Sequence, residues 1–257
     1  MIKIKDKVII SDPCYKRGTW CMSEQCNMLD GNYNYYVEEI NTDWGDKVKS
    51  IEIVHENYKR PKKWKYKNSL IGVDTGQAGI FCEEIFPKLE EERGNYGDIN
   101  TFYGKCCNLT MQNYKEIQIV LDLKESIKRN DFERSLIYYK NNQKSLESLE
   151  EYLKYHKEQF ERFSKLNIFK KSFEEEEENL VKNYDEIKNT TYYIERLKIY
   201  EEYQKTGIIP ETPKLIQYGI IDGRGIVSSS GFGDGIYCCY ANFNKKGKCI
   251  GIKIKFI

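Results

Sequence analysis

The chain lacks any long apolar run and any strong excess of charge. Its 257 residues include 41 basic and 40 acidic side chains, giving a formal net charge of +1. This balance excludes a globally basic nucleic-acid-binding protein. No apolar stretch approaches the ~20 residues that cross a bilayer, and the start, MIKIKDKVII, has no signal-peptide pattern. These absences predict a soluble, cytoplasmic protein without a membrane partner.

Histidine and closely paired cysteines are also scarce. Only His55 and His156 are present, and the nine cysteines include no C-x-x-C pair. An odd number of cysteines without a secretion signal predicts reduced thiols. A zinc site would need four thiols to meet in space, at spacings that match no common zinc motif: Cys14, Cys21, Cys26 and either Cys106 or Cys238. The sequence therefore requires no cofactor.

Glycine and proline are absent from Lys105 to Thr206, although glycine is frequent on both sides of this segment. Because both residues interrupt helices, their absence predicts a long helical segment between two β-rich ends. Apolar residues repeat at steps of three and four over 146–163 and again over 180–194. This repeat predicts two antiparallel helices of roughly 35 to 40 residues each.

Alternation of apolar and other residues, as over 249–256, is typical of half-buried strands. Related patterns predict further strands at 2–5, 7–11, 33–40, 48–54, 69–73, 80–82, 117–121, 217–221, 226–229 and 236–241. The predicted fold class is α+β: an antiparallel β-sandwich or barrel-like domain built from both chain ends, with a long antiparallel helical hairpin inserted. Residues 1–121 and 207–257 would form the β domain, and residues 122–206 the coiled-coil-like hairpin.

Three short segments combine turn residues with a carboxylate: Ser11-Asp12-Pro13-Cys14-Tyr15, Val73-Asp74-Thr75-Gly76-Gln77, and Ser228-Ser229-Ser230-Gly231-Phe232-Gly233-Asp234-Gly235-Ile236-Tyr237. They resemble the S/G-D-P-C-Y, V-D-x-G and G-D-G-x-Y turns of a loosely defined group of small, largely uncharacterised phage and bacterial proteins. The resemblance covers the flanks of the chain and not the helical segment. It implies a β-rich fold and a phage or mobile-element origin, and it implies no activity.

These motifs have two interpretations. In the first they are only turns, because Asp bonds to nearby backbone N–H groups and Gly adopts positive φ. In the second, Asp12, Asp74 and Asp234 meet at one end of the β domain, where they could hold a divalent cation or share acid–base work in a hydrolysis. His55 is the candidate base. The predicted ligand-binding set adds neighbours in the same turns: Tyr15, Gln77, Ser229, Ser230 and Tyr237.

Residues 57–67 are locally basic, with six cations, three aromatic side chains and no acid. Cations neutralise phosphates and aromatic rings stack on bases, so this composition is typical of a nucleic-acid or nucleotide site. A solvated loop and a surface for an acidic protein are the alternatives. The candidate nucleic-acid-binding residues are Lys59, Arg60, Lys62, Lys63, Trp64 and Lys65.

The sequence contains no complete catalytic signature. We therefore predict a non-catalytic binding or interaction protein that sequesters a small ligand or blocks a host protein. The hairpin, with Phe160, Phe163, Phe169 and Phe173 near its tip, would bind a protein partner or a second copy. One alternative is a metal-assisted hydrolase acting on a nucleotide phosphate through the three aspartates, and another is a nucleic-acid-binding accessory protein using residues 58–67.

Overall fold

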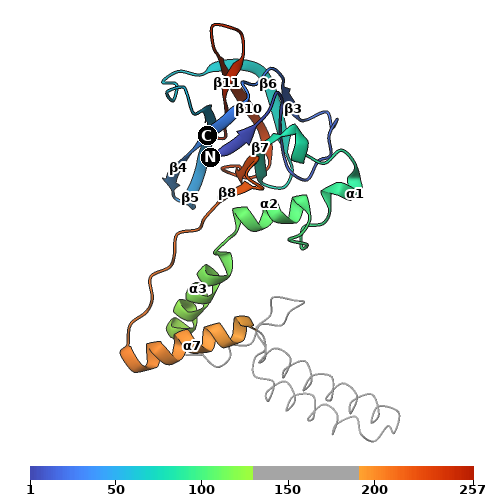
Figure 1. Cartoon of the computed structure of the whole chain (residues 1–257). Helices are drawn as coiled ribbons and strands as arrows, with labels where there is room; N and C mark the ends of the chain where they lie inside the picture. The colour runs from blue at the N-terminus through green and yellow to red at the C-terminus, as the bar shows by residue number, and fades with distance from the viewer. Residues whose placement is uncertain (130–190) are drawn as a thin grey trace, which may run out of the picture. The chain divides into compact units, whose positions relative to one another are not determined.

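The computed structural model describes residues 1–129 and 191–257 (Figure 1). The chain divides into two units. Unit 1 contains residues 1–112 and 215–257, and unit 2 contains residues 113–214. All strands of the described residues belong to unit 1, where strands from the two ends of the chain pair with each other.

Six strands of unit 1 form one antiparallel sheet, in the order β1-β4-β5-β11-β10-β6. Their bounds are β1 Ile2–Ile4, β4 Gly31–Thr42, β5 Gly45–His55, β6 Lys65–Val73, β10 Gly235–Phe243 and β11 Cys249–Lys255. The central pairing joins β5 to β11, with Glu52 opposite Lys253 and Ser50 opposite Lys255. This non-local pairing makes the sheet depend on both ends of the chain.

Five further strands form a second antiparallel sheet, in the order β3-β2-β7-β9-β8. Their bounds are β2 Val8–Ser11, β3 Ser23–Gln25, β7 Gln77–Cys82, β8 Tyr218–Ile221 and β9 Gly225–Ser229. The hydrophobic core lies between the two sheets and takes side chains from both, among them Ile51, Ile252, Ile10 and Ile80. Each fully buried aliphatic side chain contributes about 1.5–3 kcal/mol to folding.

A second, smaller core covers the other face of the five-stranded sheet. Phe81 of β7 and Ile9 of β2 pack there with Phe102 and Cys106 of helix α2. Because β2 and β7 contribute to both cores, every residue of these two strands is buried. Unit 1 therefore has three layers: the six-stranded sheet, the five-stranded sheet and the segment that contains α2.

The helices of unit 1 are short, namely the 3-10 helix η1 Glu83–Ile85, α1 Glu90–Arg93 and α2 Phe102–Thr110. The Thr101 hydroxyl caps α2 by accepting a hydrogen bond from the Gly104 N–H at 3.2 Å. Unit 2 contains α3 Tyr114–Arg129 and α7 Thr191–Thr206, which contact each other. Among the described residues, no helix combines the length and apolar character needed to cross a bilayer.

The β-rich character predicted from the sequence is confirmed, but the predicted α+β class is wrong. The described residues are mostly β, in two antiparallel sheets that do not close into a barrel, and they contain no long helical hairpin. Residues 130–190, which include most of the predicted seam and its aromatic tip, lie outside the described residues. The domain boundary predicted after residue 121 falls inside α3.

One strand prediction fails, and one strand was missed. Residues 117–121 belong to helix α3, because a short apolar run has no periodicity that separates a strand from a buried helical turn. Strand β3 was not predicted from the sequence, since its residues Ser-Glu-Gln are polar and it pairs only with β2 at a sheet edge.

Candidate functional site

The three turn motifs meet at the connection between β6 and β7, which consists of Asp74, Thr75 and Gly76. Asp12, directly after β2, is fully buried beside this turn. Its Oδ1 accepts from the Cys14 N–H (2.8 Å) and the Thr75 hydroxyl (2.7 Å). Its Oδ2 accepts from the N–H groups of Asp74 and Thr75, both at 2.9 Å. These four donors occupy the acceptor sites of the carboxylate, so Asp12 acts as a cross-link between the two segments.

Asp234 approaches the same turn from the β9–β10 connection. Its Oδ1 accepts from the Gly76 N–H at 2.9 Å, and the Gly76 carbonyl accepts from the Ser230 N–H at 2.9 Å. Gly76 has φ +67, a conformation that favours glycine. The structure thus places all three predicted aspartates around one turn. We call Asp12, Asp74, Thr75, Gly76 and Asp234 the turn junction.

The turn junction does not form a metal centre from the side chains that surround it. In the described ranges there is no group of three or more His, Cys, Asp or Glu side chains that could hold a metal ion. Asp12 has no acceptor site left, while Asp74 and Asp234 are exposed. The geometry therefore favours turn chemistry at this place.

Tyr15 and Cys14 lie against the turn junction. The Tyr15 hydroxyl donates to Oδ2 of Asp74. Burial raises the pKa of Tyr15, and this hydrogen bond raises it further. Burial also raises the pKa of the Cys14 thiol, and the negative charge of Asp12 adds to the shift. Both groups are therefore protonated at neutral pH, which makes Cys14 a poor nucleophile.

Ser230 and Tyr237 stabilise the β9–β10 turn itself. The Ser230 hydroxyl donates to the Gly233 carbonyl at 2.6 Å. The Tyr237 hydroxyl lies 2.8 Å from the Ser230 carbonyl oxygen and 2.6 Å from that of Gly233. Burial raises the pKa of Tyr237. Both predicted ligand-binding side chains thus direct their polar groups to backbone oxygens of their own turn.

Gln77 and Ser229 lie at the ends of neighbouring strands, β7 and β9, where they are opposite each other. The Gln77 Nε2 donates to the Cys107 thiol sulfur at 3.3 Å, and the Ser229 hydroxyl donates to Oε1 of Gln217 at 2.8 Å. Gln77 is buried. These contacts connect the strand ends to α2 and to the segment before β8.

His55, the predicted base, is buried at the end of β5. The Asn57 N–H donates to its Nδ1 at 3.2 Å, so Nε2 carries the proton and donates to the Asp30 carbonyl at 3.2 Å. The rings of Tyr33 and Tyr58 make edge contacts with the imidazole. Both nitrogens are therefore used in structural contacts.

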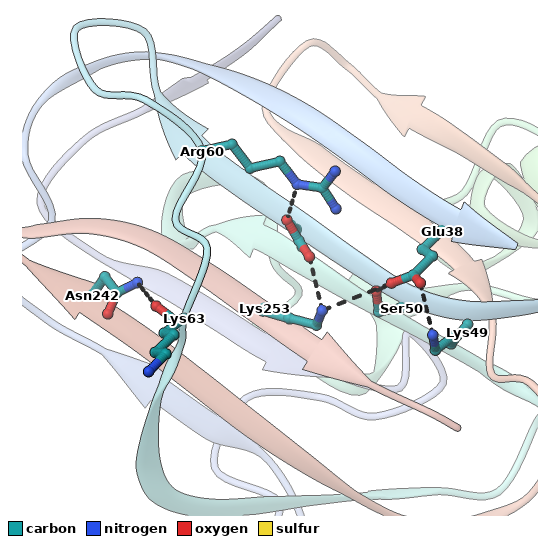
Figure 2. A network of polar contacts seen from close by, with 8 residues as sticks. Glu38, Lys49, Ser50, Arg60, Lys63, Asn242 and Lys253 are labelled. Atoms are coloured by element: carbon teal, nitrogen blue, oxygen red, sulfur yellow. Dashed lines mark hydrogen bonds and ion pairs between the residues drawn. The ribbon is translucent and has the colours of Figure 1, made fainter.

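The basic segment lies across the outer face of the six-stranded sheet, away from the main core. The Arg60 Nε donates to Glu52 of β5 at 2.7 Å, and its guanidinium lies 4.7 Å above the Tyr36 ring. The Lys63 carbonyl accepts from Nδ2 of Asn242 on β10 at 3.1 Å (Figure 2). These contacts attach the segment to β4, β5 and β10.

Glu52 is the centre of this face. Its side chain is only 2% exposed, and Lys253 of β11 donates to its Oε1 at 2.8 Å while Arg60 binds Oε2. Dashed lines in Figure 2 mark these two contacts, which begin at the labelled side chains of Arg60 and Lys253. Nearby, the Lys49 ammonium binds Glu38 at 2.7 Å. Two buried or half-buried carboxylates therefore fix three cations of the sheet face, namely Lys49, Arg60 and Lys253.

Trp64 is half-buried beside Gly251, a residue of β11 that has no side chain. A Cβ atom added at Gly251 would lie 3.1 Å from the Trp64 ring, so the glycine leaves the space that the indole occupies. The other predicted nucleic-acid-binding residues are exposed along the segment: Lys59, Arg60, Lys62, Lys63 and Lys65. The structure thus separates Trp64, which packs on the sheet, from the lysines, which extend into solvent.

Beside Trp64 lies a cavity of about 280 Å³, which we call the sheet-face cavity. Its lining consists of Glu38, Lys49, Ser50, Trp64, Tyr240, Lys253 and Lys255. Three lysines face one glutamate, so the lining carries an excess of positive charge. Of these residues the sequence predictions included only Trp64. In the sequence, the alternation of Gly251, Lys253 and Lys255 with isoleucines is the one signal that places Lys253 and Lys255 on the same face of a strand.

Residues 135–254 match the model of a family described as a protein of unknown function (DUF4241). The matched range contains Ser229, Ser230, Asp234, Tyr237 and Lys253, and it ends before Lys255. No curated protein matches the chain, and no solved structure does. The family description brings no activity to either place in unit 1.

Proposed function

We propose that this protein is a non-catalytic binding protein that captures a small anionic ligand in the sheet-face cavity. The observation that carries the proposal is the lining itself, in which three lysines meet one glutamate around about 280 Å³. This volume lies near the lower end of the ~300–1,000 Å³ typical of small-molecule sites. A concave surface with charge of one sign concentrates ligands of the opposite sign.

The lysines differ in how they are held. Glu52 fixes Lys253 and Glu38 fixes Lys49, while no acidic side chain of the described residues forms an ion pair with Lys255. Lys255 therefore contributes charge that no carboxylate neutralises. The Ser50 hydroxyl adds a neutral donor or acceptor to the lining. Fixed and unpaired cations around one cavity are suited to an anion of about the size of a diphosphate.

The lining also supports a binding role without catalysis. It contains neither histidine nor cysteine, and its one carboxylate, Glu38, is engaged by Lys49 and by Ser50. At the turn junction, the carboxylates of the candidate catalytic residues Asp12, Asp74 and Asp234 each accept a hydrogen bond from another segment of unit 1. The predicted protein partner, the phage or mobile-element origin and the host target stay predictions. Residues 160–173, whose phenylalanines were expected to bind the partner, lie outside the described residues.

Isothermal titration calorimetry with pyrophosphate tests the proposal. We expect binding that weakens between about 50 mM and about 200 mM salt, as cation–phosphate contacts require. Replacement of Lys255 by Gln should weaken binding about tenfold, which corresponds to ~1.4 kcal/mol. Lys62→Gln is the matched control, since Lys62 is an exposed lysine of the basic segment that does not line the cavity.

Two results would count against the proposal. The first is no binding of pyrophosphate to the unmodified protein at either salt concentration. The second is an equal loss for Lys62→Gln and Lys255→Gln, which would assign the binding to the general charge of the segment.

A further inference from the structure

The sheet-face cavity has two chemically different ends. Trp64 packs over Gly251, and Tyr240 of β10 lies opposite Lys253 in the register of the sheet. Further along β11 comes Lys255, opposite Ser50 of β5. Residues in a strand rise about 3.4 Å each, so the backbone of Gly251, beside Trp64, and the backbone of Lys255 are roughly 14 Å apart.

A ligand that matches both ends has a flat ring joined to an anionic group. Aromatic side chains bind flat rings by stacking. Every nucleobase can make this contact, because each has a π face. The ammonium groups bind the anion. A purely inorganic anion would use only the cationic end and would leave the aromatic wall without a partner.

Glu38 adds a further restriction on the ligand. It lines the cavity among the lysines, and its carboxylate accepts from Lys49 at 2.7 Å. A ligand that was anionic over its whole surface would be repelled by this side chain. A ligand with hydroxyl or amino donors between its ring and its anion would instead find an acceptor there.

Resting on the proposed function, we propose that the sheet-face cavity binds a nucleotide. Its base would contact Trp64, its sugar hydroxyls or base amino group would face Glu38, and its phosphate would bind Lys255 and Lys49. We infer this class of ligand from the aromatic, acceptor and cationic groups that line the same cavity. The ligand would be a free mononucleotide and not a nucleic acid. The cavity is small, and Trp64 packs against the sheet, where it cannot stack on the bases of a strand that follows the basic segment.

Tryptophan fluorescence can report this contact directly. The chain has three tryptophans, and the other two, Trp20 and Trp44, are 90% and 76% exposed. In a full-length Trp20→Phe/Trp44→Phe background, Trp64 is the only indole. The probes are AMP, GMP, CMP and UMP, compared with ribose 5-phosphate, adenosine and pyrophosphate.

We expect at least one mononucleotide to quench Trp64 and to bind at least about fivefold more tightly than both ribose 5-phosphate and adenosine, as base stacking predicts. Trp64→Leu should remove this preference, measured by calorimetry, while leaving ribose 5-phosphate binding unchanged. Lys255→Gln should weaken the binding of mononucleotides and of ribose 5-phosphate alike, and Lys62→Gln should weaken the binding of neither.

Because Trp64→Leu removes a packed side chain, its unfolding midpoint is measured first. If that variant does not fold, Gly251→Ala replaces it. The added methyl group would lie 3.1 Å from the indole and 3.0 Å from the Ile53 carbonyl oxygen. The ring would have to shift by a few tenths of an ångström, which should also reduce the preference for nucleotides, and the unfolding midpoint of this variant is measured as well because β5 is in contact with the methyl group.

The outcomes separate the two proposals. If pyrophosphate and ribose 5-phosphate bind as tightly as every nucleotide, the nucleotide assignment is wrong and the anion-binding function stands. If no probe binds, both fail. If a single-stranded oligonucleotide binds far more tightly than mononucleotides and Lys62→Gln abolishes this difference, the basic segment is a nucleic-acid surface and the mononucleotide assignment is overturned.

Discussion

Replacement of Asp12 by Asn tests whether this carboxylate is a structural cross-link. The fully buried side chain accepts four hydrogen bonds, from the N–H groups of Cys14, Asp74 and Thr75 and from the Thr75 hydroxyl. An asparagine has one oxygen, so its NH₂ group must face two of these donors. The less costly orientation directs the NH₂ group towards Cys14 and the Thr75 hydroxyl, because the hydroxyl can rotate and accept.

The expected loss of stability follows from this count. In that orientation the Cys14 N–H loses its partner, and the other bonds become neutral. A hydrogen bond to a charged group contributes about 1.5–3 kcal/mol, against about 0.5–1.5 kcal/mol for a neutral one. We therefore expect Asp12→Asn to lower the free energy of unfolding by about 2–4 kcal/mol, a large part of the ~5–15 kcal/mol of a typical domain.

Urea unfolding of the full chain, followed by circular dichroism, measures this change from the midpoint at constant slope. The control is Asp234→Asn, at an exposed carboxylate that accepts one hydrogen bond from the described residues, from the Gly76 N–H. An asparagine oxygen can replace that contact, so a change below about 1 kcal/mol is expected. If Asp12→Asn costs no more than Asp234→Asn, Asp12 is not the cross-link that its contacts indicate.

The remaining predictions concern reactivity, pH and the sheet face. Iodoacetamide at pH 8 should modify exposed Cys26 well before Cys14, since burial raises the pKa of the Cys14 thiol; equal rates by mass spectrometry would contradict this. Burial raises the pKa of Tyr103 from 10.0 to about 12, which favours its neutral form in the folded state. This stabilising contribution is complete below pH 10 and is lost as pH rises towards 12, so urea midpoints should fall over that range. They should fall less steeply if Tyr103 is replaced by Phe, and a remaining decrease is expected because the pKa values of Tyr15 and Tyr237 are raised as well. Finally, Glu52→Gln should destabilise unit 1 by about 2–3 kcal/mol, near the lower limit for a broken buried pair because Lys253 keeps some exposure; a change below about 0.5 kcal/mol would refute this.

Much of the local structure could be predicted from the sequence. The alternation along β11 and the apolar run of β2 reflect burial on one face and on two faces, and both segments are strands. The run 117–121 was assigned wrongly, because a few apolar residues fit a buried strand and a buried helix equally well. Polar β3 gave no signal, since its strand form depends on pairing with β2.

The candidate site shows the same division. Asp12 and Trp64 could be recognised from the sequence, because a carboxylate in a turn motif and an indole among lysines are patterns of adjacent residues. It did not show that Asp12 is saturated by donors from the β6–β7 turn, or that Gly251 makes room for the indole. Those facts depend on contacts between residues far apart in the chain.

Residue types and their spacing thus account for the β-rich ends and the places where turns occur, because these properties depend on neighbours a few positions away. The pairing of β5 with β11, the burial of Glu52 between two cations and the lysine-lined cavity come from tertiary structure alone. Strand pairing joins segments whose separation along the chain carries no local pattern, and a cavity exists only where such segments leave space between them.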